Sequence, residues 1–232
     1  QGRIAWLQAP ADPRQLDQWA LHDIGPAGWI MSLMWTDVDG DGDGDILASE
    51  RRGPGRGCFW LENPGHNGAR MKRWTKHPIG DGNREVMFLD YADVDGDGLR
   101  DVIVPNKPGE LLFHRRLPGE AVRWQTSHLP FPQNIGTGKS AAVADVNGDG
   151  RADIVFSCEN AKGVSGLVWL EQLPGPAATN WKQHELSGPT GIKFDLIAID
   201  DVDGDGDPDV LTCEERENLG VIWFENPSRS RQ

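Results

Sequence analysis

The feature that most constrains the fold of this chain is an aspartate-rich motif that occurs four times. It reads DVDGDGDGD at 37–45, DVDGDGLRD at 93–101, DVNGDGRAD at 145–153 and DVDGDGDPD at 201–209. The copies begin 56, 52 and 56 residues apart. A near-constant period of this length is typical of repeat architectures, in which each repeat is one supersecondary unit. We therefore expect four related structural units.

Each motif lies between two short apolar runs. The preceding runs are SLMW, VMFLDYA, AAVA and LIAI, and the following runs are ILA, VIV, IVF and VLT. Short apolar runs bounded by turn residues are typical of strands. Two more such runs follow in most repeats, for example GCFWLENP and RWTKHPI in the first. Four strands in each repeat of about 54 residues predict an all-β protein, a β-propeller of four-stranded blades.

The repeats start near residues 30, 86, 138 and 192, which predicts a single propeller domain over 1–232. The last repeat ends after its third strand, whereas residues 1–25 resemble only the last two strands of a repeat. The strand at Trp19–Ile24 is expected to close the ring by completing the last blade. The strand at Ile4–Gln8 then has no place in a complete blade. Two arrangements stay open, four blades or five with one incomplete. A spare edge strand also favours a homodimer.

The composition excludes several classes of protein. The formal net charge of −13 argues against nucleic-acid binding, which needs a basic surface. No apolar run approaches the ~18 residues of a membrane span. The three cysteines, Cys58, Cys158 and Cys213, are too few for a disulfide framework, so one pair or small buried side chains are expected.

Aspartates at alternate positions repel one another unless a cation lies among them. Oxygens at motif positions one, three, five, seven and nine can surround one ion, and hard donors in that number suit Ca²⁺. Glycine at position six permits the sharp turn that this requires. An EF-hand is excluded because strands flank the motif and its position twelve is never Glu. A solvated acidic turn is the alternative.

The motif, its strand–loop–strand setting and its period resemble the FG-GAP or VCBS-type calcium repeats. These repeats build the β-propeller of integrin α heads and of many bacterial secreted proteins, usually with seven blades. The resemblance covers nearly the whole chain and implies one structural Ca²⁺ in each loop. The implied side-chain ligands are Asp37, Asp39, Asp41, Asp45, Asp93, Asp95, Asp97, Asp101, Asp145, Asn147, Asp149, Asp153, Asp201, Asp203, Asp205 and Asp209, and the implied carbonyl ligands are those of Asp43, Leu99, Arg151 and Asp207.

Recurring residues are best assigned to the architecture. A tryptophan and a histidine recur in the predicted outer strands, and we expect them to pack and hydrogen-bond between blades. A lone metal-binding histidine would not recur together with its tryptophan. These residues are Trp19, Trp74, Trp124 and Trp181, with His22, His77, His128 and His184.

Residues that differ from repeat to repeat are better candidates for a ligand site. They occur in charged loops opposite the calcium loops, where they would surround the axial funnel of a propeller. Carboxylates there can hold a further metal ion or act as a base, and cations can stabilise developing negative charge. Solvated charges and inter-blade ion pairs are the alternative. The candidates are Glu85, Glu159, Asp195 and Glu214, with Lys139, Lys193 and Arg84.

Two classes of function follow from this reasoning. The first is a metal-dependent hydrolase of phosphotriesters, lactones or esters, with a sugar lyase or dehydratase as a variant. The second is a non-catalytic module that binds a glycan, another small molecule or a protein. Extracellular or periplasmic residence is expected for either class, because such loops commonly need calcium above cytosolic levels.

Overall fold

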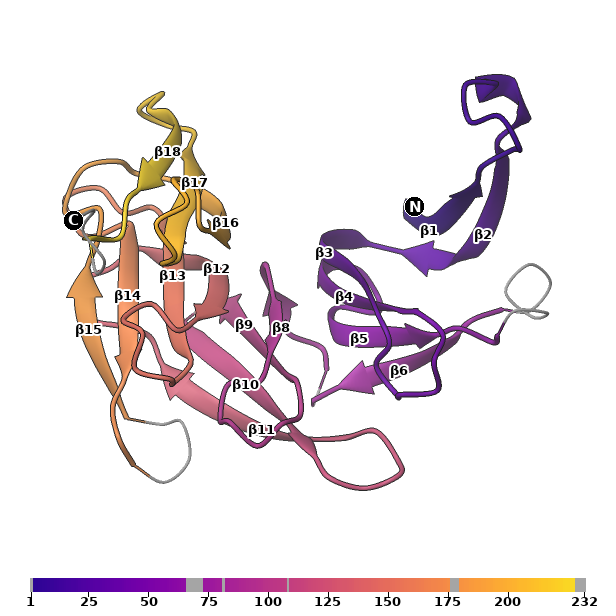
Figure 1. Ribbon diagram of the computed structural model, residues 1–232, viewed down its shortest axis with the longest axis horizontal. Coiled ribbons are helices and arrows are strands. Elements are labelled where there is room, and N and C mark those ends of the chain that lie inside the picture. Colours follow the sequence, from indigo (N-terminus) through magenta and orange to yellow (C-terminus); the bar gives the residue numbers. More distant parts are fainter. Residues whose placement is uncertain (1, 66–72, 81, 108, 176–179, 228–232) are drawn as a thin grey trace. The chain divides into compact units, whose positions relative to one another are not determined.

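The computed structural model describes residues 2–65, 73–80, 82–107, 109–175 and 180–227. Apart from the short 3-10 helix η1 (Leu16–Gln18), the regular elements of these residues are strands. The chain divides into two compact units, Gln1–Val86 and Met87–Gln232. Its four repeats form four antiparallel blades of a β-propeller, which confirms the predicted fold class (Figure 1).

Unit 1 contains an N-terminal hairpin, β1-β2, and blade 1, whose strand order is β3-β4-β5-β6. Ile4 and Ile24 of the hairpin pack in one apolar core with Ala48, Phe59 and Trp74 of blade 1. The strand bounds are Gly2–Gln8 (β1), Ala20–Ala27 (β2), Trp29–Thr36 (β3), Asp45–Arg52 (β4), Gly57–Glu62 (β5), Thr75–Ile79 (β6) and Glu85–Val86 (β7).

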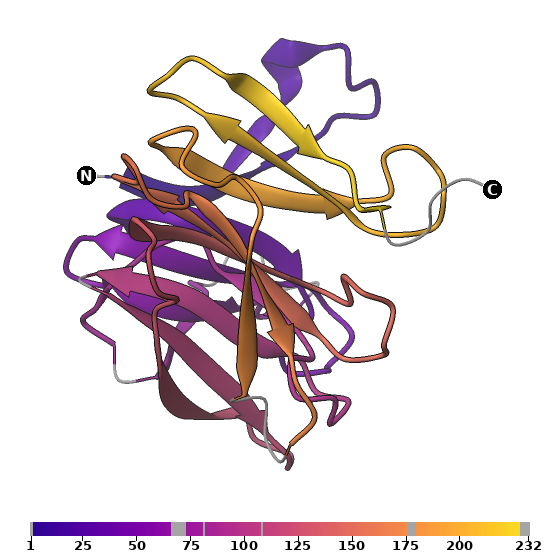
Figure 2. The same ribbon diagram turned by 90° about the vertical axis from the view of Figure 1, so that its left-hand side faces the viewer.

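Unit 2 contains three blades in chain order (Figures 1 and 2). Blade 2 has the order β8-β9-β10-β11, blade 3 the order β12-β13-β14-β15, and blade 4 the order β16-β17-β18. The strand bounds are Asp90–Ala92 (β8), Asp101–Lys107 (β9), Glu110–Leu117 (β10), Arg123–Pro130 (β11), Thr137–Ala144 (β12), Asp153–Glu159 (β13), Leu167–Gln172 (β14), Trp181–Glu185 (β15), Phe194–Asp200 (β16), Asp209–Glu214 (β17) and Gly220–Phe224 (β18).

Adjacent blades of unit 2 bury their apolar faces against each other. Ile103 of blade 2 packs in one core with Ile154 and Phe156 of blade 3. On the other face of blade 3, Val155 packs with Val210 of blade 4. Both faces of β13 are therefore covered, which explains why its sequence is a continuous apolar run rather than an alternating one.

The first strand of a blade is irregular at the end far from the aspartate loop. The pairing register with the second strand shifts around Met31 in blade 1, Lys139 in blade 3 and Asp195 in blade 4. A bulge of this kind inserts an extra residue and re-aims its side chain. The same structural position therefore carries an apolar residue in one blade and a charged residue in two others.

The first strand of blade 2 differs from its sequence-based prediction as one continuous run, VMFLDYA. Of the described part of this run that lies in unit 2, the segment Asp90–Ala92 forms the strand that pairs with β9. Pro105 of β9 has no N–H to donate to a neighbouring strand, so it cannot support a regular ladder. Its carbonyl instead accepts a hydrogen bond from the backbone N–H of Met87, at 2.9 Å. The proline thus explains the break in this strand.

Blade 4 has three strands, as the repeat pattern predicts. Its edge strand β18 leaves Val221 80% exposed, and among the described residues it pairs with β17 alone. Closure of this blade by Trp19–Ile24, and a homodimer through a spare edge, both stay predictions. The three cysteines are free. Within the described ranges no helix has the length and apolar character to cross a membrane.

Candidate functional site

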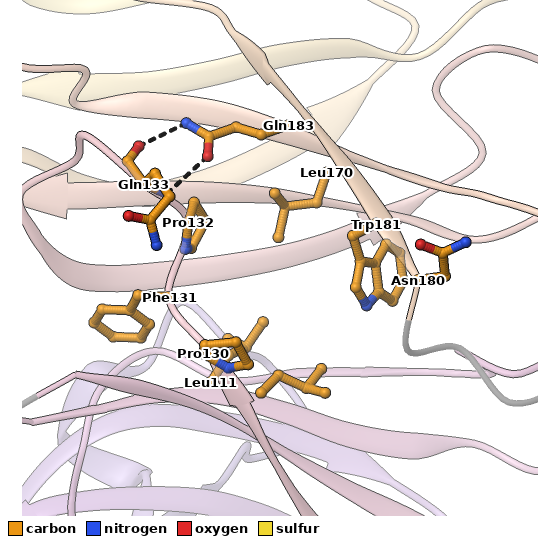
Figure 3. Close-up of a pocket in the computed structure, with 10 residues that line it drawn as sticks. Leu111, Pro130, Phe131, Pro132, Gln133, Leu170, Asn180, Trp181 and Gln183 are labelled. Atoms are coloured by element: carbon orange, nitrogen blue, oxygen red, sulfur yellow. Dashed lines mark hydrogen bonds between the residues drawn. The ribbon is translucent and has the colours of Figure 1, made fainter.

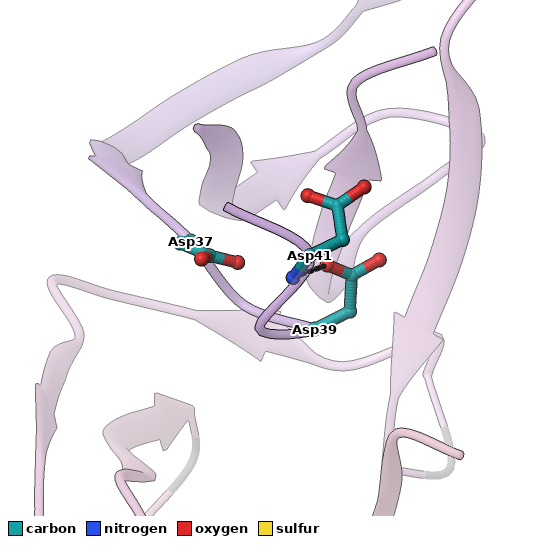
Figure 4. Close-up of side chains that lie close together, drawn as sticks. All are labelled: Asp37, Asp39 and Asp41. Atoms are coloured by element: carbon teal, nitrogen blue, oxygen red, sulfur yellow. Dashed lines mark hydrogen bonds between the residues drawn. The ribbon is translucent and has the colours of Figure 1, made fainter. Parts of the chain in front are cut away.

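The four aspartate motifs form the turns between the first and second strands of their blades. We call them loop 1 (37–45), loop 2 (93–101), loop 3 (145–153) and loop 4 (201–209). In loop 1, Gly40 and Gly42 have φ of +83° and +93°, a conformation that glycine adopts without strain. Figure 4 shows how this turn brings together the side chains of Asp37, Asp39 and Asp41.

The first aspartate of each motif fixes the turn by accepting backbone hydrogen bonds. In loop 1, Asp37 accepts from the N–H of Gly40 at 2.7 Å and from that of Gly42 at 3.1 Å. In loop 2, Asp93 accepts from Gly96 and Gly98, both at 2.8 Å. Loops 3 and 4 repeat this role with Asp145 and Asp201.

Positions three and five form consecutive turns of the same kind. The side chain at position three accepts from the N–H at position five, as Asp39 does from Asp41 at 3.1 Å. The side chain at position five accepts from the N–H at position seven, as Asp41 does from Asp43 at 2.9 Å. Such side-chain-to-backbone bonds are what aspartate and asparagine offer a turn. They hold the loop in shape and leave the second carboxylate oxygen of each aspartate for other partners.

The ninth aspartate ties its loop to the blade and is buried in all four repeats. Asp101 is 0% exposed, and its two oxygens accept from the backbone N–H groups of Val94 (3.0 Å) and Arg116 (2.7 Å). The corresponding bonds recur at Asp45, Asp153 and Asp209. Burial raises the pKa of Asp101 to about 6, although these hydrogen bonds oppose the rise. A nearby cation would favour its charged form.

The donor set fits Ca²⁺. Among the described residues, three loops bring three carboxylates together with one oxygen of each lying within 4.8 Å of the others. All donors are hard oxygens, and the loop shape is set by hydrogen bonds within the protein. Loop 3 is not among these three loops, since Asn147 replaces a carboxylate at its position three. The grouped residues are Asp37, Asp39 and Asp41; Asp93, Asp95 and Asp101; and Asp201, Asp203 and Asp209.

A second group of charged side chains lies in unit 2, at the ends of strands far from these loops. We call it the ionic cluster; Lys139 is its centre, with a side chain only 7% exposed. The ammonium of Lys139 is 2.9 Å from Asp195 and 3.6 Å from Glu159. The bulges at Lys139 and Asp195 aim both side chains into this space. The members of the cluster are Lys107, Lys139, Glu159, Lys193, Asp195 and Glu215.

Positive and negative charges alternate through the ionic cluster. Glu159 also contacts Lys107, while Lys193 contacts Glu215 and lies 3.7 Å from Asp195. Burial alone would raise the pKa of Asp195, but the hydrogen bond from Lys139 and the charges of Lys139 and Lys193 lower it. The cluster contains three ammonium groups and three carboxylates. A catalytic metal ion does not fit this arrangement, because each carboxylate already faces an ammonium that would repel it.

A polar cavity of about 370 Å³ opens at one side of the ionic cluster. It is lined by Glu159, Asn160, Lys193, Glu215 and Arg216. Asn160 has φ of +59°, so the turn after β13 presents this residue in a left-handed conformation. Arg216 is exposed, and no carboxylate of the described chain lies within ion-pair distance of it. The cavity thus offers one unmatched cation together with hydrogen-bond donors and acceptors.

The profile of a family described as an FG-GAP-like repeat matches residues 93–156. This segment spans loops 2 and 3 and the strands between them. This match and the four blades support an FG-GAP-type β-propeller. They confirm the family resemblance, while the calcium ligands stay a prediction. No curated protein is significantly similar to the chain.

Glu214 of this FG-GAP-type propeller has an environment different from that of the ionic cluster. It is 2% exposed, and its carboxylate accepts from the backbone N–H groups of Ile192, Lys193, Arg216 and Glu217 at 2.8–3.1 Å. Burial opposes the charged form, yet these hydrogen bonds lower the pKa of Glu214 to about 2. The side chain thereby anchors the two loops that carry Lys193 and Arg216. Its predicted catalytic role stays untested.

Glu85 and Arg84 lie in unit 1. Glu85 accepts a 2.8 Å hydrogen bond from Arg51 and lies 3.6 Å from Arg52. Both guanidinium groups cover the ring of Trp29, at 4.9 and 5.6 Å from its centroid. The sequence places Lys107 and Glu215, two further members of the ionic cluster, in the charged loops around the predicted funnel, but they were not among the candidate site residues. They occupy equivalent places at the ends of second strands, and that repeat position is the signal that could have found them.

Three of the four recurring histidines contact tryptophans, but not those of their own strands; the fourth, His128, lies 3.1 Å from the carboxylate of Glu110. His22 stacks on Trp6, and the same stacking joins His77 to Trp60 and His184 to Trp169, with ring centroids 4.2–4.3 Å apart. Each pair lies directly across two neighbouring strands. These histidines therefore pack and hydrogen-bond within a hairpin or blade and not between blades as expected, whereas Trp181 of blade 3 packs against Val94 and Phe113 of blade 2, as expected.

An apolar groove of about 270 Å³ lies between the outer parts of blades 2 and 3 (Figure 3). Leu111, Phe131, Leu170 and Trp181 line it, and a pair of 2.8 Å hydrogen bonds joins Gln183 to the backbone of Gln133 at its end. None of the described residues that line the groove has an ionisable side chain, so they offer no group for acid–base chemistry.

Proposed function

We propose that this chain is a calcium-stabilised β-propeller that binds an anionic, hydroxylated small molecule, such as an acidic sugar, at the ionic cluster. The observation that carries the proposal is the difference between blades at equivalent positions. Lys139 and Asp195 occupy the bulge that holds Met31 in blade 1. A single asymmetric ligand requires such a difference, whereas a purely architectural position would repeat.

The chemistry of the cavity supports this ligand class. Arg216 has no carboxylate partner among the described residues and can bind an anionic group, for which its planar fork is well suited. Glu159, Glu215 and the Asn160 amide can accept or donate hydrogen bonds to hydroxyl groups. A volume of about 370 Å³ fits a ligand of one or two sugar rings by comparison with ordinary small-molecule pockets.

Calorimetric titration with neutral and acidic sugars tests the proposal. We expect binding of an acidic member of the panel, weakened at least about tenfold in R216Q, because a charged hydrogen bond contributes more than 1.4 kcal/mol. E185Q changes an exposed glutamate of blade 3 and serves as the control. Absence of binding to every compound, or equal binding by R216Q and the wild type, would contradict the proposal.

A hydrolase is the second candidate, and one observation favours it. Lys139 is nearly buried and touches two carboxylates, an arrangement that can hold and transfer a proton. Since a metal ion does not fit the cluster, this candidate uses the side chains alone. Screening ester, lactone, phosphotriester and sugar substrates tests it. Activity that persists in K139M would exclude Lys139 from the chemistry.

The proposed calcium sites in the four loops imply that the chain works outside the cytosol. Each loop would hold its ion with the side chains that the repeat pattern indicates, and the ion would neutralise carboxylates that otherwise repel one another. Loops of this kind commonly need calcium at the levels found in extracellular fluid or periplasm. Targeting the protein to either side of a membrane tests this location. We expect it to be active only in the compartment that contains calcium at these levels.

A further inference from the structure

We propose that Ca²⁺ binds loop 2 in competition with the guanidinium of Arg115, which makes loop 2 a weaker calcium site than loops 1 and 4. The inference rests on the calcium sites proposed above and concerns their inequality. It assigns to Arg115 a role as an internal cation that occupies loop 2 when calcium is scarce.

Arg115 lies in β10 and reaches across to the loop of its own blade. Its Nε contacts Asp95, and its Nη2 is 2.8 Å from an oxygen of Asp97. These are positions three and five of the motif, whose carboxylates are predicted calcium ligands. The Asp95 side chain is 6% exposed, so the guanidinium neutralises a carboxylate that has little access to water. A cation from the protein thus stands where the loop would place its ion.

The other blades have the opposite charge at this position. The strand registers make Arg115 equivalent to Glu62 in blade 1, Glu171 in blade 3 and Glu225 in blade 4. In blade 1, Glu62 follows Leu61, which pairs with Ile46, the residue directly after loop 1, so this position lies beside the end of a loop. Blade 2 has reversed the charge at a place where three blades carry a carboxylate.

The loops also differ in their own charge. Loops 1 and 4 each have five aspartates, because Asp43 and Asp207 occupy position seven. Loop 2 has four aspartates and faces Arg115, and loop 3 has three, one of which contacts Arg151. The implied ligand at position seven is the backbone carbonyl, so Asp43 and Asp207 add negative charge beside the ion rather than a further carboxylate ligand. Negative charge this close to a calcium ion strengthens its binding. Loops 1 and 4 are therefore the tight sites, and loops 2 and 3 the weak ones.

Binding in loop 2 requires the guanidinium to move away from Asp95 and Asp97. The Arg115 side chain is 39% exposed, so water can solvate it after displacement. The competition has a consequence for stability. In calcium-free solution Arg115 stabilises loop 2, whereas in calcium it opposes the ion.

Calcium titrations of chelator-treated protein test this inference, with R115E and R115Q as variants. R115E restores the charge found in the other blades, and R123Q is the control. Arg123 lies in the neighbouring strand β11, and its guanidinium donates a hydrogen bond to the carbonyl of Pro118, at 3.2 Å. We expect R115E to tighten one of the two weak calcium-binding events, that of loop 2, at least about tenfold and R115Q to tighten it less, because a charge change within a few ångströms of a divalent ion acts strongly. The double variant D97N/R115E should lose this gain.

Melting temperatures give a second readout that a merely structural ion pair would not produce. R115E should melt lower than the wild type in EDTA but recover fully, or exceed it, in excess calcium. Unchanged calcium affinities in R115E, with calcium bound by the wild type, would overturn this inference alone. A lower melting temperature in both EDTA and calcium would also overturn it. Absence of calcium binding by all variants would overturn the proposed calcium sites together with it.

Discussion

Replacement of Glu214 by glutamine removes one charge from a buried carboxylate that accepts four backbone hydrogen bonds. Oε1 of Glu214 accepts hydrogen bonds from the backbone N–H groups of Ile192, Lys193 and Arg216, and Oε2 accepts from Glu217. Glutamine keeps one acceptor oxygen but places an NH₂ group against the remaining N–H. Two donors then face each other in a buried place, and three hydrogen bonds lose the assistance of the charge.

Two arguments give a similar magnitude for this loss. A buried N–H left without a partner costs about 1–3 kcal/mol, and the three weakened bonds add to it. The lowered pKa gives an independent figure: a fall from 4.5 to about 2 corresponds to about 3 kcal/mol, which screening by nearby solvent reduces. We therefore expect E214Q to lower the free energy of unfolding by about 2 kcal/mol at pH 7.

The effect should depend on pH with a defined sign. A carboxylate whose pKa is lower in the folded state contributes stability above its unfolded pKa, and that stability is lost as the pH falls toward the folded pKa. For Glu214 this window extends from pH 4.5 down to about 2. The difference in stability between wild type and E214Q should be constant from pH 7 to 5 and shrink below pH 4.5.

Urea unfolding followed by tryptophan fluorescence at several pH values measures this difference, in buffer that contains calcium. E185Q is the matched control, since Glu185 is exposed. An E214Q variant as stable as E185Q at pH 7 would refute the anchoring role of Glu214. A stability difference that stays the same down to pH 2.5 would refute its electrostatic origin.

Three further predictions concern the core, the ionic cluster and the loops. G136A should destabilise unit 2 by about 1–3 kcal/mol in urea unfolding, because an added Cβ would lie 2.3 Å from the Glu159 carbonyl oxygen; wild-type stability would contradict this contact. K139M, which introduces the residue type found at the equivalent position Met31, should lower the free energy of unfolding by about 2–4 kcal/mol. D195N should lower it less in the K139M background than alone, and strictly additive losses would show that the two side chains are not coupled. EDTA should lower the melting temperature by several degrees, because an ion that binds only the folded state stabilises it by about 2.7 kcal/mol when its concentration is 100 times its dissociation constant. An unchanged melting curve would count against structural calcium.

The blades could be predicted because their signals are local and repeated. Strand runs, glycines and aspartates recur in one order, so each repeat supports the interpretation of the others. The break in the first strand of blade 2 was missed, since it depends on Pro105 in a neighbouring strand that cannot donate a hydrogen bond. Proline affects the partner strand here rather than its own.

The candidate site was predictable in part. Lys139, Lys193, Glu159 and Asp195 were expected to converge, and the structure brings them into contact. The alternation of charges could not be predicted, because it depends on which side chains the bulges re-aim. The backbone hydrogen bonds to Glu214 were also hidden, since they come from loops 21–22 residues away in the sequence and from the turn that follows it.

The central claim is that the four aspartate loops enclose divalent ions. Equilibrium dialysis against Ca²⁺ at millimolar concentration, followed by elemental analysis, measures the number of ions bound per chain directly. We expect a number close to four at saturation, falling by one in D37N and again in D201N. A chain that retains its fold but binds no calcium would contradict this account of why the acidic turns exist.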